Sequence, residues 1–241
     1  MKSPSFPMRI FWIVTIFSIA MGFFESAVVI YLREILYPEG FDFPLAPIEI
    51  DLAITELIRE AATIIMLLCI GILVGRTLAE RFAWFIYSFA IWDIFYYIFL
   101  KLLIGWPESL LTWDILFLIP IIWIGPVISP VIVALTMILL AIILIYWSHK
   151  TGRISIKWPE WVIFISGSVI LILVWIRDYS GYILEHYAFR KIWTIPKDDL
   201  YNLSMQYIPR KFNWGLYWIG EGIILTGIVL LFLRFRKLKS K

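Results

Sequence analysis

The first long apolar run of the chain is IFWIVTIFSIAMGFFESAVVIYL, residues 10–32, and its only charged side chain is Glu25. An α-helix needs about 20 predominantly apolar residues to cross the hydrocarbon core of a bilayer. Inside lipid the backbone must satisfy its own hydrogen bonds, and a helix does so within one segment. The run therefore predicts a membrane-spanning helix that carries one intramembrane carboxylate.

The composition of the whole chain indicates the same class of protein. Its 241 residues are 62% hydrophobic and 16% charged, and the mean hydropathy is +0.89. Soluble domains average about 25% charged residues. A soluble fold of this length could not bury so much apolar surface, so the excess must face lipid. We predict an all-α integral membrane protein with a single polytopic transmembrane domain, residues 1–241.

Six apolar segments are predicted to be spans. They comprise residues 10–32, 52–74, 82–103, 127–147, 161–176 and 214–235. The stretch at residues 110–124, before the fourth span, is too short for a comfortable crossing. Together with Pro120 and Pro126 it predicts a re-entrant segment or half-helix. The connections at residues 33–51 and 177–213 are the sizeable polar segments, and we assign both to the outer side.

The distribution of Lys and Arg predicts the orientation, because these residues are enriched on the cytoplasmic side. With six spans both termini share one side, which bears Lys2, Arg9 and the basic tail from Arg234. We therefore place both termini in the cytoplasm and the chain in a plasma or inner membrane. A seventh span would move the basic tail outside. A signal peptide cleaved after Ser18-Ile19-Ala20 is the other alternative, but the apolar run continues to Leu32 and favours a retained span.

Four carboxylates lie inside separate apolar runs: Glu25, Glu60, Asp93 and Glu221. From the rise of 1.5 Å per residue, each lies within roughly 6 Å of the midpoint of its predicted helix. A charged side chain near the bilayer centre costs about 3 kcal/mol or more. The shared depth therefore predicts that the four converge on one polar, outward-facing site lined by the first, second, third and sixth spans.

Helical spacing adds further residues to this predicted site. Side chains three and four residues apart share a helix face, so Glu56 and Arg59 join Glu60 on the second span. We identify four other contributors by spacing or position: Tyr97, Lys101, Asp114 and Tyr217. A packing role is the alternative, in which Glu56, Arg59 and Glu60 form an internal ion pair that only joins two spans.

The charge of the predicted site limits its chemistry. Five carboxylates around the single cation Arg59 cannot all ionise in a low dielectric, so protons or a bound cation must neutralise them. Hard oxygen ligands would suit Mg²⁺, Ca²⁺ or Mn²⁺. Haem and iron–sulfur clusters are disfavoured, because His149 and His186 lie outside the predicted spans and Cys69 is the single cysteine. The sequence contains no P-loop or GxGxxG motif, which disfavours a nucleotide cofactor.

These features favour a permease or a proton- or ion-coupled transporter over an enzyme. In this interpretation Glu60 and Asp93 bind the proton or cation, and Arg59 adjusts their acidity. One alternative is a membrane enzyme that acts on a lipid or lipid-linked substrate with a carboxylate-held divalent metal. Another is a non-catalytic structural subunit of a membrane complex. The expected partners are membrane lipid, a small solute or cation and, for a subunit, other membrane proteins, but not nucleic acid.

Overall fold

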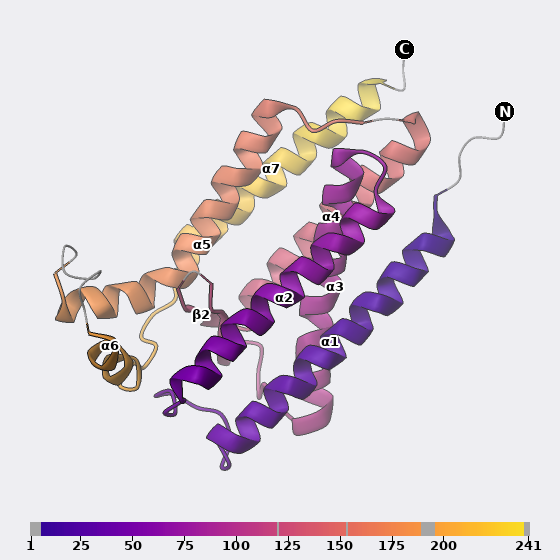
Figure 1. The fold of residues 1–241 in the computed structure, drawn as a ribbon. Coiled ribbons are helices and arrows are strands. Elements are labelled where there is room, and N and C mark those ends of the chain that lie inside the picture. Colours follow the sequence, from indigo (N-terminus) through magenta and orange to yellow (C-terminus); the bar gives the residue numbers. More distant parts are fainter. Residues whose placement is uncertain (1–5, 120, 153, 189–195, 239–241) are drawn as a thin grey trace.

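The computed structural model describes residues 6–119, 121–152, 154–188 and 196–238 (Figure 1). Six of its helices are long and apolar enough to span a membrane. They are α1 (Met8–Leu36), α2 (Ile50–Val74), α3 (Leu78–Ile104), α4 (Ile128–Thr151), α5 (Trp158–His186) and α7 (Trp214–Leu238). The prediction of an all-α membrane protein with six spans is confirmed. In Figure 1, α1 begins and α7 ends at the same end of the bundle.

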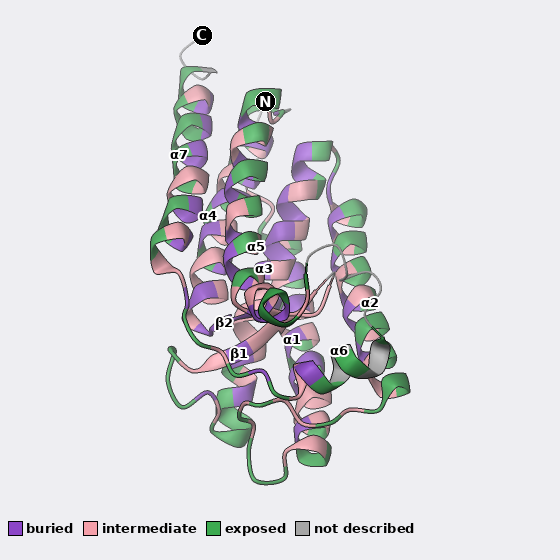
Figure 2. Ribbon diagram, turned by 90° about the vertical axis from the view of Figure 1, so that its left-hand side faces the viewer, coloured by how far each residue is buried: buried purple, intermediate pink, exposed green. Residues whose placement is uncertain are grey.

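Large apolar side chains cover the faces of these helices that point away from the bundle. Ile16, Ile58 and Ile65 keep 65%, 63% and 59% of their surface exposed. Figure 2 shows the same division along the helices, with exposed residues on the outward faces and buried residues on the inward ones. Apolar surface this extensive is disfavoured in water and suits contact with lipid chains. The chain is therefore a multi-pass membrane protein.

The spans form two groups. Helix α3 packs against α1, α2 and α4, and together these four make the α1–α4 group. Its apolar core includes Trp84 of α3 and Leu144 of α4. A glycine lets α2 approach α3 closely, since a Cβ atom on Gly71 would lie 2.5 Å from the carbonyl oxygen of Arg81. Helices α5 and α7 form the α5–α7 pair, which meets the first group between α4 and α7.

The predicted half-helix at residues 110–124 is wrong. The segment forms an antiparallel hairpin of β1 (Trp113–Phe117) and β2 (Trp123–Pro126). Aromatic and β-branched residues favour extended backbone, and Pro120 would interrupt a helix over this range. The hairpin nevertheless lies directly before the fourth span, where the sequence predicts that helical structure is interrupted.

This hairpin lies between the two helix groups. Strand β2 packs against α5 and α4, and Trp123 stacks on Trp175 of α5 with ring centroids 5.5 Å apart. At the other side, the backbone N–H of Leu118 donates to Glu60 of α2. Glu60 is two residues from the central residue of α2, which is about 3 Å along the helix axis. The hairpin therefore brings non-helical backbone against the middle of a span.

The connection predicted at residues 177–213 is partly helical. Helix α5 continues ten residues beyond its predicted end, to His186, and its last turns bend away from the rest of the helix (Figure 1). The segment after α6 (Lys197–Ser204) packs onto these turns through the buried ring of Tyr207. Burial, together with the hydrogen bond of 2.5 Å that it donates to Asp178, raises the pKa of the Tyr207 hydroxyl. Packed aromatic side chains thus cover this part of the end opposite the termini.

Candidate functional site

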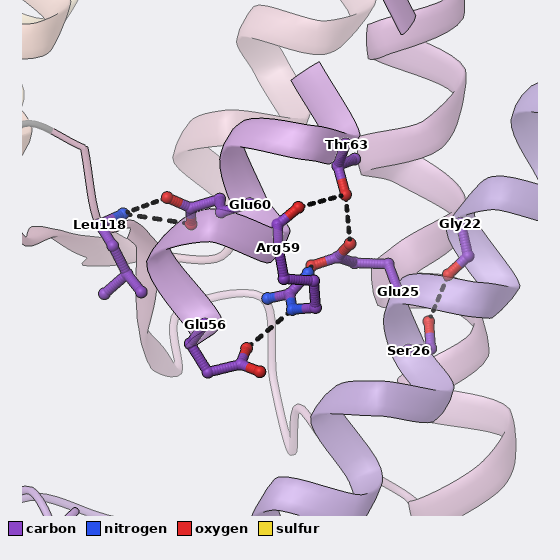
Figure 3. Close-up of polar contacts among 8 residues, drawn as sticks. All are labelled: Gly22, Glu25, Ser26, Glu56, Arg59, Glu60, Thr63 and Leu118. Atoms are coloured by element: carbon purple, nitrogen blue, oxygen red, sulfur yellow. Dashed lines mark hydrogen bonds and ion pairs between the residues drawn. The ribbon is translucent and has the colours of Figure 1, made fainter. Parts of the chain in front are cut away.

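Arg59 of α2 is half-buried and pairs with two carboxylates, Glu56 of the same helix and Glu25 of α1 (Figure 3). The Arg59 guanidinium donates through Nη1 to Glu25 and through Nε to Oε2 of Glu56, the latter at 2.7 Å. The Thr63 hydroxyl lies 3.3 Å from the other oxygen of Glu25 and donates to it. The i, i+3 and i, i+4 spacing of these α2 residues places them on one helix face. The side chains of Glu25 and Glu56 are 8% and 10% exposed, so these charges are largely withdrawn from solvent.

Glu60 faces the hairpin instead of this ion-pair cluster. Figure 3 shows Arg59 pointing toward Glu25, whereas the Glu60 carboxylate points toward Leu118. Its two oxygens accept the Leu118 N–H at 3.2 and 3.0 Å. A backbone N–H buried in a membrane protein must find such a partner, because lipid supplies none. Glu60, in the middle of α2, therefore supplies the hydrogen-bond acceptor for this backbone N–H of the hairpin.

A second cluster connects α1, α3 and the start of the hairpin. Asp114 of β1 accepts hydrogen bonds of 3.2 Å from Arg33 and of 3.2 Å from Tyr97. The Arg33 guanidinium also lies 3.7 Å from the ring centroid of Trp106 and 4.5 Å from that of Phe41. Burial raises the pKa of Asp114, whereas the Arg33 charge and the Tyr97 hydroxyl lower it. Arg33 is thus the charged partner of Asp114 in this cluster.

Asp93 lies beside this second cluster. It is one turn from Tyr97 on α3, and Tyr97 donates to Asp114. Within residues 6–119, 121–152, 154–188 and 196–238 it has neither a hydrogen bond nor an ion pair. Lys101, two turns from Asp93, instead donates to the carbonyl oxygens of Gly105 and Pro107 at 2.9 and 2.8 Å. Lys101 therefore secures the end of α3 and does not neutralise the carboxylates.

Glu221 belongs to a third region, where α4 meets the α5–α7 pair. One oxygen accepts a hydrogen bond from Thr136 of α4, and the other is buried without a partner among the described residues. Tyr217, one turn away, donates to the carbonyl oxygen of Ser129 at 2.8 Å. Trp175 of α5 donates to the hydroxyl of the same serine at 2.9 Å. These contacts hold the two helix groups together.

The predicted site residues thus fall into three groups instead of one cavity. Glu25, Glu56 and Arg59 lie together with Glu60 adjacent, Tyr97 and Asp114 lie together with Asp93 adjacent, and Glu221 and Tyr217 contact α4. In the described part of the chain, no group of three or more His, Cys, Asp or Glu side chains is placed to hold a metal ion. The arrangement supplies hydrogen-bonded carboxylates, which suit exchange of protons or single cations.

Sequence reasoning did not identify Arg33, Leu118 or Thr136. Arg33 fell outside the predicted first span, because the apolar run ends at Leu32 whereas α1 continues to Leu36. Leu118 acts through its backbone N–H, which carries no sequence signal. No family model, curated protein or solved structure matches this chain.

Replacing Arg59 with Gln should destabilise the protein strongly, because it leaves two buried carboxylates without their cation. Removing one partner of a buried ion pair costs about 3–5 kcal/mol. The double variant Arg59→Gln/Glu25→Gln should recover a substantial part of that loss, since one of the two charges is then gone. Thermal and denaturant unfolding in nanodiscs would measure both effects.

The matched control for this experiment is Arg76→Gln, because it removes the same charge in a connection outside the spans. It should change the free energy of unfolding little. If Arg59→Gln were as stable as Arg76→Gln, the ion pairs of Arg59 would not hold α1 and α2 together.

Proposed function

We propose that the protein is a permease of the proton- or cation-coupled type, with Glu60 as the coupling carboxylate. The observation that carries the proposal is the contact of Glu60 with the Leu118 N–H at 3.2 and 3.0 Å. A titratable side chain in the middle of one span holds the non-helical backbone that separates the two helix groups. In many transporters such interrupted backbone lines the substrate or ion site and moves between access states.

Charge balance supports a role for protons or cations. Among the described residues, Arg59 is the cation in hydrogen-bonding contact with Glu25 and Glu56, and it directly precedes Glu60 on α2. If all three carboxylates ionise, the group carries two net negative charges in a low-dielectric setting. Such a charge is reduced by protonation or by a bound cation. Asp93, near the second cluster, is another carboxylate that can take up a proton or bind a cation.

The contacts of the hairpin suggest how protonation of Glu60 would be coupled to movement of the hairpin and of the α5–α7 pair. An ionised carboxylate accepts the Leu118 N–H through a charge-assisted hydrogen bond, which is roughly twice as strong as a neutral one. Protonation weakens this bond and releases the hairpin tip from α2. Because Trp123 of the hairpin stacks on Trp175 of α5, a displaced tip would change how the α5–α7 pair sits against the α1–α4 group.

The two alternative functions receive less support. A carboxylate-held divalent metal would need several oxygen ligands at one point. The described residues provide no such group. A purely structural subunit would account for the ion pairs of Arg59, but it gives no role to Asp93. Both alternatives predict a protein without intrinsic ion or solute flux.

We also propose that both termini face the cytoplasm of a plasma or inner membrane, on the basis of the Lys and Arg distribution. In a Cys69→Ser background, a membrane-impermeant maleimide should label Glu39→Cys in intact cells. Lys157→Cys, at the opposite end of the bundle, should react only after permeabilisation. The reverse labelling pattern would show the opposite orientation.

Transport is tested in proteoliposomes that enclose a pH-sensitive dye. Gradients of Na⁺, K⁺, neutral amino acids and sugars are imposed one at a time, and at least one should drive proton movement through the wild type. Glu60→Gln should reduce that flux at least tenfold while the protein stays folded, because the amide cannot exchange a proton. Glu108→Gln, an exposed acid in the α3–β1 connection, should leave the flux unchanged.

Two results would contradict the proposal. One is the absence of proton movement with every gradient, which would favour the enzyme or subunit alternatives. The other is equal flux in the wild type and Glu60→Gln, which would remove Glu60 from the coupling mechanism.

A further inference from the structure

A pocket of about 340 Å³ opens at the end of the bundle opposite the termini. Its walls come from three segments that are distant in the sequence: the α1–α2 connection, the start of the hairpin and the chain between α6 and α7. Three aromatic side chains line it: Phe41, Phe43 and Trp113. The volume falls within the range of small-molecule sites, about 300–1,000 Å³, and aromatic walls are typical of them.

One carboxylate stands among these rings. Asp42 lines the pocket between Phe41 and Phe43, and its Oδ1 accepts the backbone N–H of Phe43 at 2.8 Å. It is exposed and forms no ion pair with any described residue. The opposite wall, Ile208 and Pro209, is apolar. Among the described residues of the lining, Asp42 is the one with a formal charge, and it is negative.

Two arginines beside the lining residues are already paired with carboxylates. Arg33, behind Phe41, is paired with Asp114 at 3.2 Å. Arg210, next to Pro209 in the chain, donates to both oxygens of Glu185 at 2.8 Å. Both cations are thus already bound to carboxylates of their own.

One ring of the pocket lining, Phe41, already contacts a cation of the protein. The guanidinium of Arg33 lies over the rings of Trp106 and Phe41 at 3.7 and 4.5 Å. A cation over an aromatic face gains about 0.5–2 kcal/mol, and several rings around a quaternary ammonium group form a selective site. The described lining combines three rings with a carboxylate that has no cation partner among the described residues, and this combination suits such a group.

We propose that this pocket binds an organic ammonium group of the choline type, with Asp42 as the counter-ion and Phe41, Phe43 and Trp113 as the aromatic wall. The group can belong to a free solute or to a lipid headgroup, since the recognised chemistry is the same. The inference concerns binding alone, so it does not depend on the proposed transport function.

The first test is titration of choline chloride into the protein in phosphatidylglycerol nanodiscs by isothermal calorimetry, against NaCl at equal ionic strength. Choline should bind saturably, whereas Na⁺ should not. Asp42→Asn should weaken choline binding at least tenfold. Asparagine keeps the oxygen that accepts the Phe43 N–H, so the loop should stay folded, and thermal unfolding would verify this.

The matched control is Glu39→Gln, which removes the same charge from the same connection but does not line the pocket. It should bind choline as the wild type does. The proposal is overturned if choline does not bind saturably, if Asp42→Asn binds it unchanged, or if Glu39→Gln weakens binding equally.

A second arm distinguishes the two sources of the ammonium group. In phosphatidylcholine nanodiscs, a site for lipid headgroups should be occupied already, so the apparent affinity for free choline should fall in the wild type. A site for a free solute should bind choline equally in both lipids. These choline titrations do not depend on transport. A protein that moves no protons in the transport assay would still give one of these two binding results.

Discussion

Backbone placed among membrane-spanning helices without helical hydrogen bonds must be satisfied by the surrounding protein, and the hairpin before α4 imposes this constraint. Its strands pair with each other, and the N–H of Leu118 at its tip is satisfied by Glu60. Glu60 therefore cannot be seen as an isolated polar defect in α2. It is the connection between a span of the α1–α4 group and the segment that contacts α5.

The same shortage of solvent explains why several of the buried charges are arranged in pairs. Arg59 compensates Glu25 and Glu56, and Arg33 compensates Asp114 at the start of the hairpin. A charge without a partner costs several kcal/mol in such surroundings, whereas a hydrogen-bonded pair is tolerated. Among the described residues Glu60 has only a backbone partner, so no ion pair balances its charge when it ionises. Among the three carboxylates around Arg59, Glu60 therefore has the strongest reason to exchange a proton or bind a cation.

The sequence predicts those features that arise from local periodicity. The six spans follow from apolar runs, and the pair Glu56–Arg59 follows from spacing by three residues. The hairpin could not be predicted reliably, since short apolar segments fit helix and strand alike. Contacts such as Arg33–Asp114 and Glu60–Leu118 join residues 81 and 58 positions apart, so no local pattern indicates them. Depth along a helix predicts the level of a carboxylate but not the neighbour it faces, which is why Glu221 is separated from the others.

Amide hydrogen exchange of residues 113–126, followed by mass spectrometry in nanodiscs, tests the central claim most directly. The hairpin should exchange slowly in the wild type, because its strands pair with each other and the Leu118 N–H is bonded to Glu60. In Glu60→Leu it should exchange at least tenfold faster while the spans keep their protection. A hairpin that exchanges like a free loop in the wild type, or that is unaffected by Glu60→Leu, would contradict the account.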